Sequence, residues 1–359
     1  MKSFYEPTTE HLDRLVCPWV ASYSGGKDST SLVTWIEWLR RAGWIECPNP
    51  RLIQSDTGVE DVGLQAVSAK MMDVLTASGW SCMVVKPLIH ERLYNRILGL
   101  GVTPIHPGIR TMRWCTRSTK IAPINRVKLA SGETSLTGLR LGESRMRDGK
   151  IKTSCAAGGE CGIPEQSRDT YSPILHWSTC QVVDWLSGRV DKSVRSRIHD
   201  ILDATRQLIE IYSIGIDRNV FDWADPVVTA SRFGCIGCPA ISAEATAPRS
   251  VIARYGEPSP ICELYAVWHE ARQKKNRCQP HAGDRQHGPI RIAARKQLFA
   301  RVLDIQQRAG IQLVTPDDEA WIRDCWEHGR YPRGWSAADE ATAPPAESSL
   351  FDELASVKS

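Results

Sequence analysis

A glycine-rich stretch near the amino terminus has the residue types that hold a phosphate. It consists of Ser24, Gly25, Gly26, Lys27, Asp28 and Ser29. Adjacent glycines let consecutive backbone N–H groups turn inward, and the amino end of a following helix adds partial positive charge. Lys27 adds a full charge, so the stretch is predicted to bind an anion. A Walker loop is excluded, because its glycines are separated by four residues.

Asp28 is unusual beside a phosphate. Either a Mg²⁺ ion bridges its carboxylate to the phosphate, or the side chain caps the helix, since Asp is a common capping residue. The alternative for the whole stretch is a Gly-Gly turn with an Asp or Ser cap. The complete six-residue string after an apolar strand favours the phosphate site.

Further charged residues are expected near the same ligand. Asp56, in Ser-Asp-Thr-Gly, is predicted to contact a ribose or a metal, or else to form an Asx-turn before Gly58. A second group follows the apolar residues 135–139 and suits phosphate clamping, with surface ion pairing as the alternative. Its members are Arg140, Glu143 and Arg145. Lys120 is expected to contact the anion or to be a solvated helix residue.

The chain has twelve cysteines, and its first fifteen residues are charged where a signal peptide would be apolar. We therefore expect a cytoplasmic protein with reduced thiols. Five cysteines lie in apolar or isolated contexts and are expected to be ordinary core residues: Cys17, Cys47, Cys82, Cys180 and Cys325. Cys262 and Cys278 are also expected to be structural.

The remaining cysteines are candidates for a metal site. Cys235 and Cys238 form a Cys-x-x-Cys pair in a Gly/Pro context, which fits a metal or cluster site, a redox dithiol or half of a zinc site. Cys155 and Cys161 lie in a stretch without periodicity, and Cys115 lies in Arg-Trp-Cys-Thr. This makes five candidate cysteines for the four ligand positions of a metal or cluster site.

The elements that position these residues alternate between strands and helices. Apolar runs predict strands at 16–23, 51–55, 83–85 and 135–139, and helical spacing predicts helices at 29–39, 178–186, 194–213 and 289–308, with a helix-compatible stretch ending near 75. This alternation indicates an α/β fold with a parallel sheet. Ligands of such sheets bind at the carboxyl ends of the strands, where residues 24–29 and Asp56 fall.

The length of 359 residues fits one large or two ordinary domains. We expect a phosphate-loop domain at 1–190, a helical region with the Cys-x-x-Cys site at 191–336, and a disordered, Ala/Pro-rich tail at 337–359. No stretch approaches the roughly 18 consecutive apolar residues of a membrane span, so no membrane partner is expected.

Positive charge is concentrated in one segment. Residues 110–152 contain eleven Lys and Arg against three acids, a local charge of +8 in a chain whose formal net charge is +4. A nucleotide or a nucleic-acid backbone is the expected partner, and a solvated face is the alternative.

The Ser-Gly-Gly-Lys-Asp-Ser string resembles the loop of the ATP pyrophosphatase (PP-loop) superfamily, whose members split ATP between its α- and β-phosphates. Four further stretches look like the phosphoadenylylsulfate (PAPS) reductase branch: 55–60, 113–123, 138–145 and 171–186. The resemblance covers roughly residues 20–190. It implies a doubly wound sheet of the adenine nucleotide alpha hydrolase type and catalytic roles for Lys27, Asp28, Arg140 and Glu143.

In the cluster-bearing members of this branch, the two cysteines of the Arg-x-Cys-Cys string bind the cluster together with the two cysteines of a later Cys-x-x-Cys. Here Thr116 replaces the second cysteine of that pair. The resemblance therefore implies a [4Fe–4S] cluster on Cys115, Cys235, Cys238 and either Cys155 or Cys161. The second choice is zinc on Cys155, Cys161, Cys235 and Cys238, which leaves Cys115 as a sulfur-handling thiol.

The C-terminal third, from Gly288 to Pro332, looks like the tail of the DndC/SspD type, which acts in DNA phosphorothioation. A short amphipathic helix is the alternative explanation. This likeness implies adenylylation of a DNA phosphate, with a cysteine desulfurase and other phosphorothioation proteins as partners.

Other functions remain open. A PAPS or adenylylsulfate reductase normally needs a nucleophilic cysteine near its C-terminus, and the last cysteine here is Cys325. A tRNA-thiolating enzyme would use tRNA in place of DNA. A non-enzymatic, cluster-bearing subunit that binds nucleic acid would have a vestigial loop and would not hydrolyse ATP.

Overall fold

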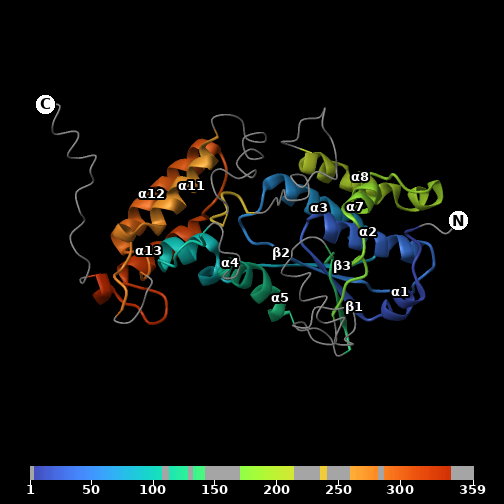
Figure 1. Ribbon diagram of the computed structural model, residues 1–359, viewed down its shortest axis with the longest axis horizontal. Coiled ribbons are helices and arrows are strands. Elements are labelled where there is room, and N and C mark those ends of the chain that lie inside the picture. Colours follow the sequence, from blue (N-terminus) through green and yellow to red (C-terminus); the bar gives the residue numbers. More distant parts are fainter. Residues whose placement is uncertain are drawn as a thin grey trace. The chain divides into compact units, whose positions relative to one another are not determined.

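The computed structural model describes residues 4–106, 113–127, 132–141, 170–213, 235–240, 259–281 and 287–340. The chain forms two compact units (Figure 1). The first comprises Met1–Pro87 and Thr119–Cys235, and the second comprises Leu88–Ser118 and Ile236–Ser359. The chain therefore passes between the units three times.

The first unit is built on a parallel sheet. Its strands are β1 (Trp19–Tyr23), β2 (Arg51–Ser55), β3 (Ser81–Val85), β4 (Thr134–Leu136) and β5 (Thr170–Tyr171). Their order is β3-β2-β1-β4-β5, and each neighbouring pair is parallel. The α/β fold and the four strands predicted from apolar runs are confirmed, whereas the two-residue β5 was not anticipated.

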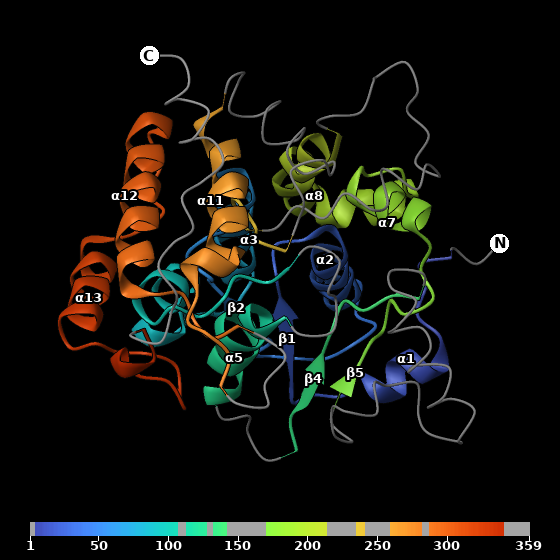
Figure 2. The same cartoon turned by 60° about the vertical axis from the view of Figure 1, so that its left-hand side comes forward.

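Helices of the first unit cover the sheet. They are α1 (Thr9–Arg14), α2 (Lys27–Arg41), α3 (Val62–Ala77), α5 (Ala122–Arg126), α7 (Thr179–Leu186) and α8 (Lys192–Ser213). Right-handed crossovers between parallel strands place α2 and α3 on the same face. Helix α8 packs on both, and Figures 1 and 2 show these helices and α7 together on one side of the sheet.

The strand order places the predicted phosphate site at a reversal point. The chain adds β2 and β3 on one side of β1 and then β4 and β5 on the other. Ligands of such sheets bind beyond the carboxyl ends of the two strands that flank the reversal. Residues 24–26 follow β1 and residues 137–140 follow β4, so both segments leave the sheet at this point.

Burial of α2 fixes the position of the segment that precedes it. Every side chain from Ser29 to Leu39 is buried. Hydrogen bonds also tie this helix to its surroundings, for example at Thr34, whose Oγ1 accepts a hydrogen bond of 2.8 Å from Trp185 Nε1. A helix enclosed on all sides has little freedom to shift, so the residues at its amino end are held firmly against the sheet.

Regular elements described in the second unit are helices. The longest are α11 (Glu263–Arg272), α12 (Ile292–Ala309) and α13 (Pro316–Glu327). Shorter helical turns are η1 (Ile89–Glu91), η2 (Asn95–Gly99), α4 (Trp114–Thr116), η5 (Pro260–Cys262), η6 (Lys274–Asn276) and η7 (Ala337–Glu340); a π-helix, η3 (Arg117–Ile121), crosses between the units. None of the helices described here has the length and hydropathy needed to cross a bilayer.

These units differ in their limits from the expected domains. Helix α8 follows residue 190, yet it packs in the first unit, and residues 88–118 belong to the second. Residues 337–340, at the start of the predicted tail, form η7, while 341–359 lie outside the described residues.

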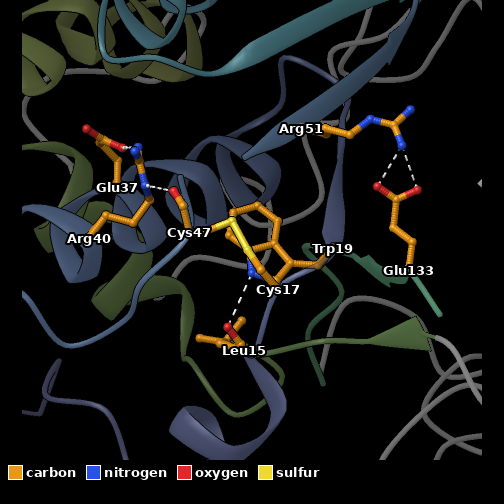
Figure 3. Close-up of a disulfide and its surroundings, with 8 residues drawn as sticks. All are labelled: Leu15, Cys17, Trp19, Glu37, Arg40, Cys47, Arg51 and Glu133. Atoms are coloured by element: carbon orange, nitrogen blue, oxygen red, sulfur yellow. Dashed lines mark hydrogen bonds and ion pairs between the residues drawn. A yellow bond between two sulfur atoms is a disulfide. The ribbon is translucent and has the colours of Figure 1, made fainter. Parts of the chain in front are cut away.

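A disulfide joins Cys17 to Cys47, with 5.7 Å between their Cα atoms (Figure 3). The expectation that both are ordinary core thiols is therefore wrong. Cys17 leads into β1 and Cys47 leads into β2, which are parallel neighbours and so begin at the same edge of the sheet. Cys180 is exposed, which also contradicts its expected place in the core, whereas Cys325 is buried as expected.

Replacing Cys17 with Ser is expected to lower the free energy of unfolding by about 3 to 4 kcal/mol, because a bridge across a sequence separation of 30 restricts the unfolded chain. Urea denaturation of the oxidised proteins measures this difference. The exposed Cys180→Ser variant is the matched control and should unfold like the wild type. An unchanged midpoint on reduction of the wild-type protein would contradict a stabilising bridge.

Candidate nucleotide-binding site

The segment between β1 and α2 forms a tight loop around Ser29. Gly25 has a positive φ of 70°, which favours glycine, and Gly26 is the N-cap of α2. Ser29 Oγ accepts a hydrogen bond of 3.2 Å from the backbone N–H of Ser24 and donates one of 3.1 Å to the Gly26 carbonyl. The predicted strand, glycine turn and helix are thus present, with the amino end of α2 at the carboxyl end of β1.

Three of the predicted catalytic residues lie together at this helix end. Asp28 Oδ2 accepts a hydrogen bond of 2.8 Å from Lys27 Nζ, and Asp28 Oδ1 accepts one of 2.6 Å from Arg140 Nε. Because Gly26 is the N-cap and makes no side-chain capping bond, the alternative that Asp28 caps α2 is wrong. Its carboxylate instead joins two cations.

Arg140 is directed toward protein groups. Its side chain is only 3% exposed, and besides Asp28 it donates to the Trp177 carbonyl at 2.9 Å and to Thr179 Oγ1 at 3.5 Å. In this arrangement the guanidinium orients Asp28. Contact between Arg140 and a bound phosphate stays a prediction.

Gly138 brings the segment after β4 against the start of α2. A Cβ at this position would lie 2.8 Å from the backbone nitrogen of Ser29 and 2.9 Å from the carbonyl carbon and oxygen of Asp28. A side chain there would collide with backbone that is fixed by the buried helix. The close approach that aligns Arg140 with Asp28 therefore requires glycine.

Asp56 follows β2 and forms the Asx-turn considered as an alternative. Its Oδ1 accepts a hydrogen bond of 2.9 Å from the N–H of Gly58, and its Oδ2 lies 3.5 Å from Lys86 Nζ. Lys86 is largely exposed, so this ion pair contributes little to stability. The predicted contact of Asp56 with ribose or metal stays a prediction.

Glu60 is a residue that the sequence analysis did not single out. Its side chain is 10% exposed, and its Oε1 lies 3.5 Å from Nζ of Lys120. Burial raises the pKa of its carboxyl, and the charge of Lys120 opposes this shift. Its backbone forms an isolated antiparallel bridge with Cys235, so one residue of the Cys-x-x-Cys pair lies beside the segment that leaves β2.

Cys238, the other half of the pair, belongs to the second unit and packs on α11. Trp268 Nε1 donates a hydrogen bond of 2.6 Å to the Gly237 carbonyl, and Arg272 donates to the Pro239 carbonyl. Burial raises the pKa of Tyr265, and the nearby charges of Cys238 and Cys262 raise it further. Cys262, expected to be purely structural, therefore lies near the same tyrosine as Cys238.

Within the described ranges, no three His, Cys, Asp or Glu side chains converge to hold a metal ion. Cys115 lies on α4 of the second unit and is half-buried. Four predicted site residues fall outside the described ranges: Glu143, Arg145, Cys155 and Cys161. Both oxygens of Asp28 already bind cationic groups. The described residues therefore do not by themselves form a complete site for Mg²⁺, a [4Fe–4S] cluster or zinc, and all three stay predictions.

No protein-family model matches the chain, and no curated protein matches it either. The resemblance to the PP-loop superfamily accordingly depends on the motifs and on the geometry that surrounds them.

Replacing Arg140 with Ala is expected to lower the free energy of unfolding by about 3 kcal/mol or more, because it removes one of the two cations that pair with the largely buried carboxylate of Asp28. Arg189→Ala is the matched control. Its ion pair with Asp184 is exposed, so the loss should stay below about 1 kcal/mol. Urea denaturation measures both, and equal losses would show that burial of the Asp28 pair is unimportant.

Proposed function

We propose that the protein is an ATP pyrophosphatase that adenylylates a nucleic-acid phosphate, the DNA backbone in the first instance, to activate it for sulfur insertion. A doubly wound sheet of the adenine nucleotide alpha hydrolase type is part of this proposal. Support for ATP binding comes from the loop at residues 24–29, which lies at the reversal point of the sheet with Lys27 at the amino end of α2.

The observation that carries the sulfur-transfer proposal is the backbone bridge between Glu60 and Cys235. Glu60 lies five residues beyond the end of β2, and β2 is the parallel neighbour of the strand that leads into the phosphate loop. A cysteine whose backbone pairs with the segment leaving that strand suits chemistry in which sulfur meets an activated phosphate. A simple nucleotide-binding domain has no need for it.

In the proposed reaction, an oxygen of the nucleic-acid phosphate attacks the α-phosphorus of ATP, and the bond to the β-phosphate breaks. Pyrophosphate leaves with the electron pair of that bond, and Lys27 stabilises its charge. The product is a mixed anhydride, in which AMP has become the leaving group on the acceptor phosphate. A persulfide delivered by a cysteine desulfurase then attacks the acceptor phosphorus and displaces AMP, and the original oxygen departs with it. A dithiol reductant supplies two electrons that break the remaining S–S bond, which leaves the sulfur on the phosphate.

In this scheme Asp28 and Arg140 position Lys27 and take no direct part in bond making. Arg140 fixes the carboxylate of Asp28, which in turn fixes the ammonium of Lys27.

The Lys27→Ala variant is expected to lower AMP formation at least about 100-fold, because one charged group that stabilises the leaving pyrophosphate is lost. Labelled ATP is incubated with the full chain and DNA, and AMP and pyrophosphate are quantified. Lys70→Ala is the matched control, since it removes an exposed lysine of α3 and should leave the rate unchanged.

The same assay separates the competing functions. Formation of AMP with tRNA in place of DNA would indicate tRNA thiolation, and release of sulfite from adenylylsulfate in the presence of thioredoxin would indicate a reductase. DNA binding should weaken as salt rises. Production of ADP, or no AMP under any condition, contradicts the proposal.

A further inference from the structure

Three donors of the phosphate loop bind acceptors of the protein itself. The Ser24 N–H bonds to Ser29 Oγ at 3.2 Å, and Lys27 Nζ bonds to Asp28 Oδ2 at 2.8 Å. The backbone N–H of Lys27 donates to the hydroxyl of Tyr212 at 3.4 Å. Lys27 N–H and Nζ are donors that a phosphate at the amino end of α2 would use, so a phosphate bound to them has to replace the present acceptors.

Tyr212 reaches the loop from the last turn of α8. The residue is 7% exposed, and its ring lies beneath the Lys27 ammonium, with 5.7 Å from Nζ to the ring centroid. A Cβ added to Gly26 would lie 3.6 Å from the Tyr212 hydroxyl. The tyrosine therefore lies next to Gly26, to the backbone N–H of Lys27 and to the Lys27 ammonium.

Packing of α8 makes this contact a property of the fold. Helix α8 lies against both α2 and α3. These are the helices that follow β1 and β2. The hydroxyl is thus presented to the loop by an element anchored along its length, and 185 positions separate the two residues in sequence.

We propose that Tyr212 occupies the phosphate site and competes with the ligand until the ligand displaces it. Its hydroxyl oxygen accepts the hydrogen bond of the Lys27 amide that a phosphate oxygen would accept. Its ring makes a cation–π contact with the Lys27 ammonium, which a charged phosphate would otherwise bind. This inference rests on the proposed function, because it assumes that the loop binds the pyrophosphate part of ATP.

Competition follows from the difference between the two acceptors. A phosphate oxygen is charged and forms a stronger bond to an N–H group than a neutral hydroxyl does. Phosphate therefore displaces the hydroxyl, and its apparent affinity is reduced by the fraction of molecules in which the hydroxyl is in place. Removing the hydroxyl while keeping the ring should raise the affinity for phosphate.

The test uses Tyr212→Phe in the full chain, with inorganic pyrophosphate and ATP as probes in isothermal titration calorimetry. The variant is expected to bind pyrophosphate about 2- to 10-fold more tightly, as expected for loss of one competing neutral hydrogen bond. Tyr5→Phe is the matched control. It removes a half-buried hydroxyl that donates to the Gln181 carbonyl, away from the loop, and should leave the affinity unchanged.

Hydrogen exchange of the Lys27 amide gives a second readout that needs no catalysis. Without ligand, this amide should exchange faster in Tyr212→Phe than in the wild type, and saturating pyrophosphate should make the two rates equal. A purely structural role of the hydroxyl predicts a difference that persists when pyrophosphate is bound.

Each outcome is decisive. Equal affinity in Tyr212→Phe and wild type overturns the inference, and weaker binding in the variant overturns it in favour of a hydroxyl that donates to phosphate. Absence of pyrophosphate binding by the wild type also overturns it, together with the proposed function. If the wild type forms no AMP but shows the expected dependence on Tyr212, the proposed function fails and the role of Tyr212 stands.

Discussion

The ion pair between Arg140 and Asp28 is the contact on which the geometry of the phosphate loop depends. It joins the segment after β4 to the first turn of α2, at the place where the strand order reverses. Because Arg140 is almost completely buried, each charge needs the other. Gly138 permits the approach, and the buried body of α2 prevents the helix from moving away. The orientation of Lys27 is therefore set by residues that follow the carboxyl ends of β1 and β4.

Each carboxylate at the ends of β1 and β2 lies close to at least one cation. Asp28 is paired with Lys27 and Arg140, Asp56 with Lys86, and Glu60 with Lys120. Such pairing lets cations lie near one another without the mutual repulsion of an unpaired cluster. An incoming anion then replaces a carboxylate as the partner of a cation. Selectivity among anions depends on how much more strongly each one binds that cation than the carboxylate does.

Local patterns made much of the first unit predictable. Apolar runs marked β1 to β4, helical spacing marked α2, α7, α8 and α12, and the glycine-lysine string marked the loop. The position of Arg140 at a strand end was also predictable. Its direction was not, because it depends on Trp177 and Asp28, which are brought to it by other elements.

Contacts between distant segments could not be predicted in this way. The disulfide follows from the parallel pairing of β1 and β2, and neither cysteine has a local signal. Tyr212 resembles any apolar residue on a helix, and Glu60 gains its bridge to Cys235 only through the folded chain. Cys238 acts on the charge of the Tyr265 hydroxyl only through packing of the second unit, so the sequence does not show that it and Cys262 lie near the same tyrosine.

The disulfide in Figure 3 closes a ring that contains β1, the phosphate loop and all of α2. A single proteolytic cut inside this ring would leave the two pieces covalently joined, and they would migrate as one species until the bridge was reduced. The segment that carries Lys27 is therefore protected from loss even when its backbone is broken.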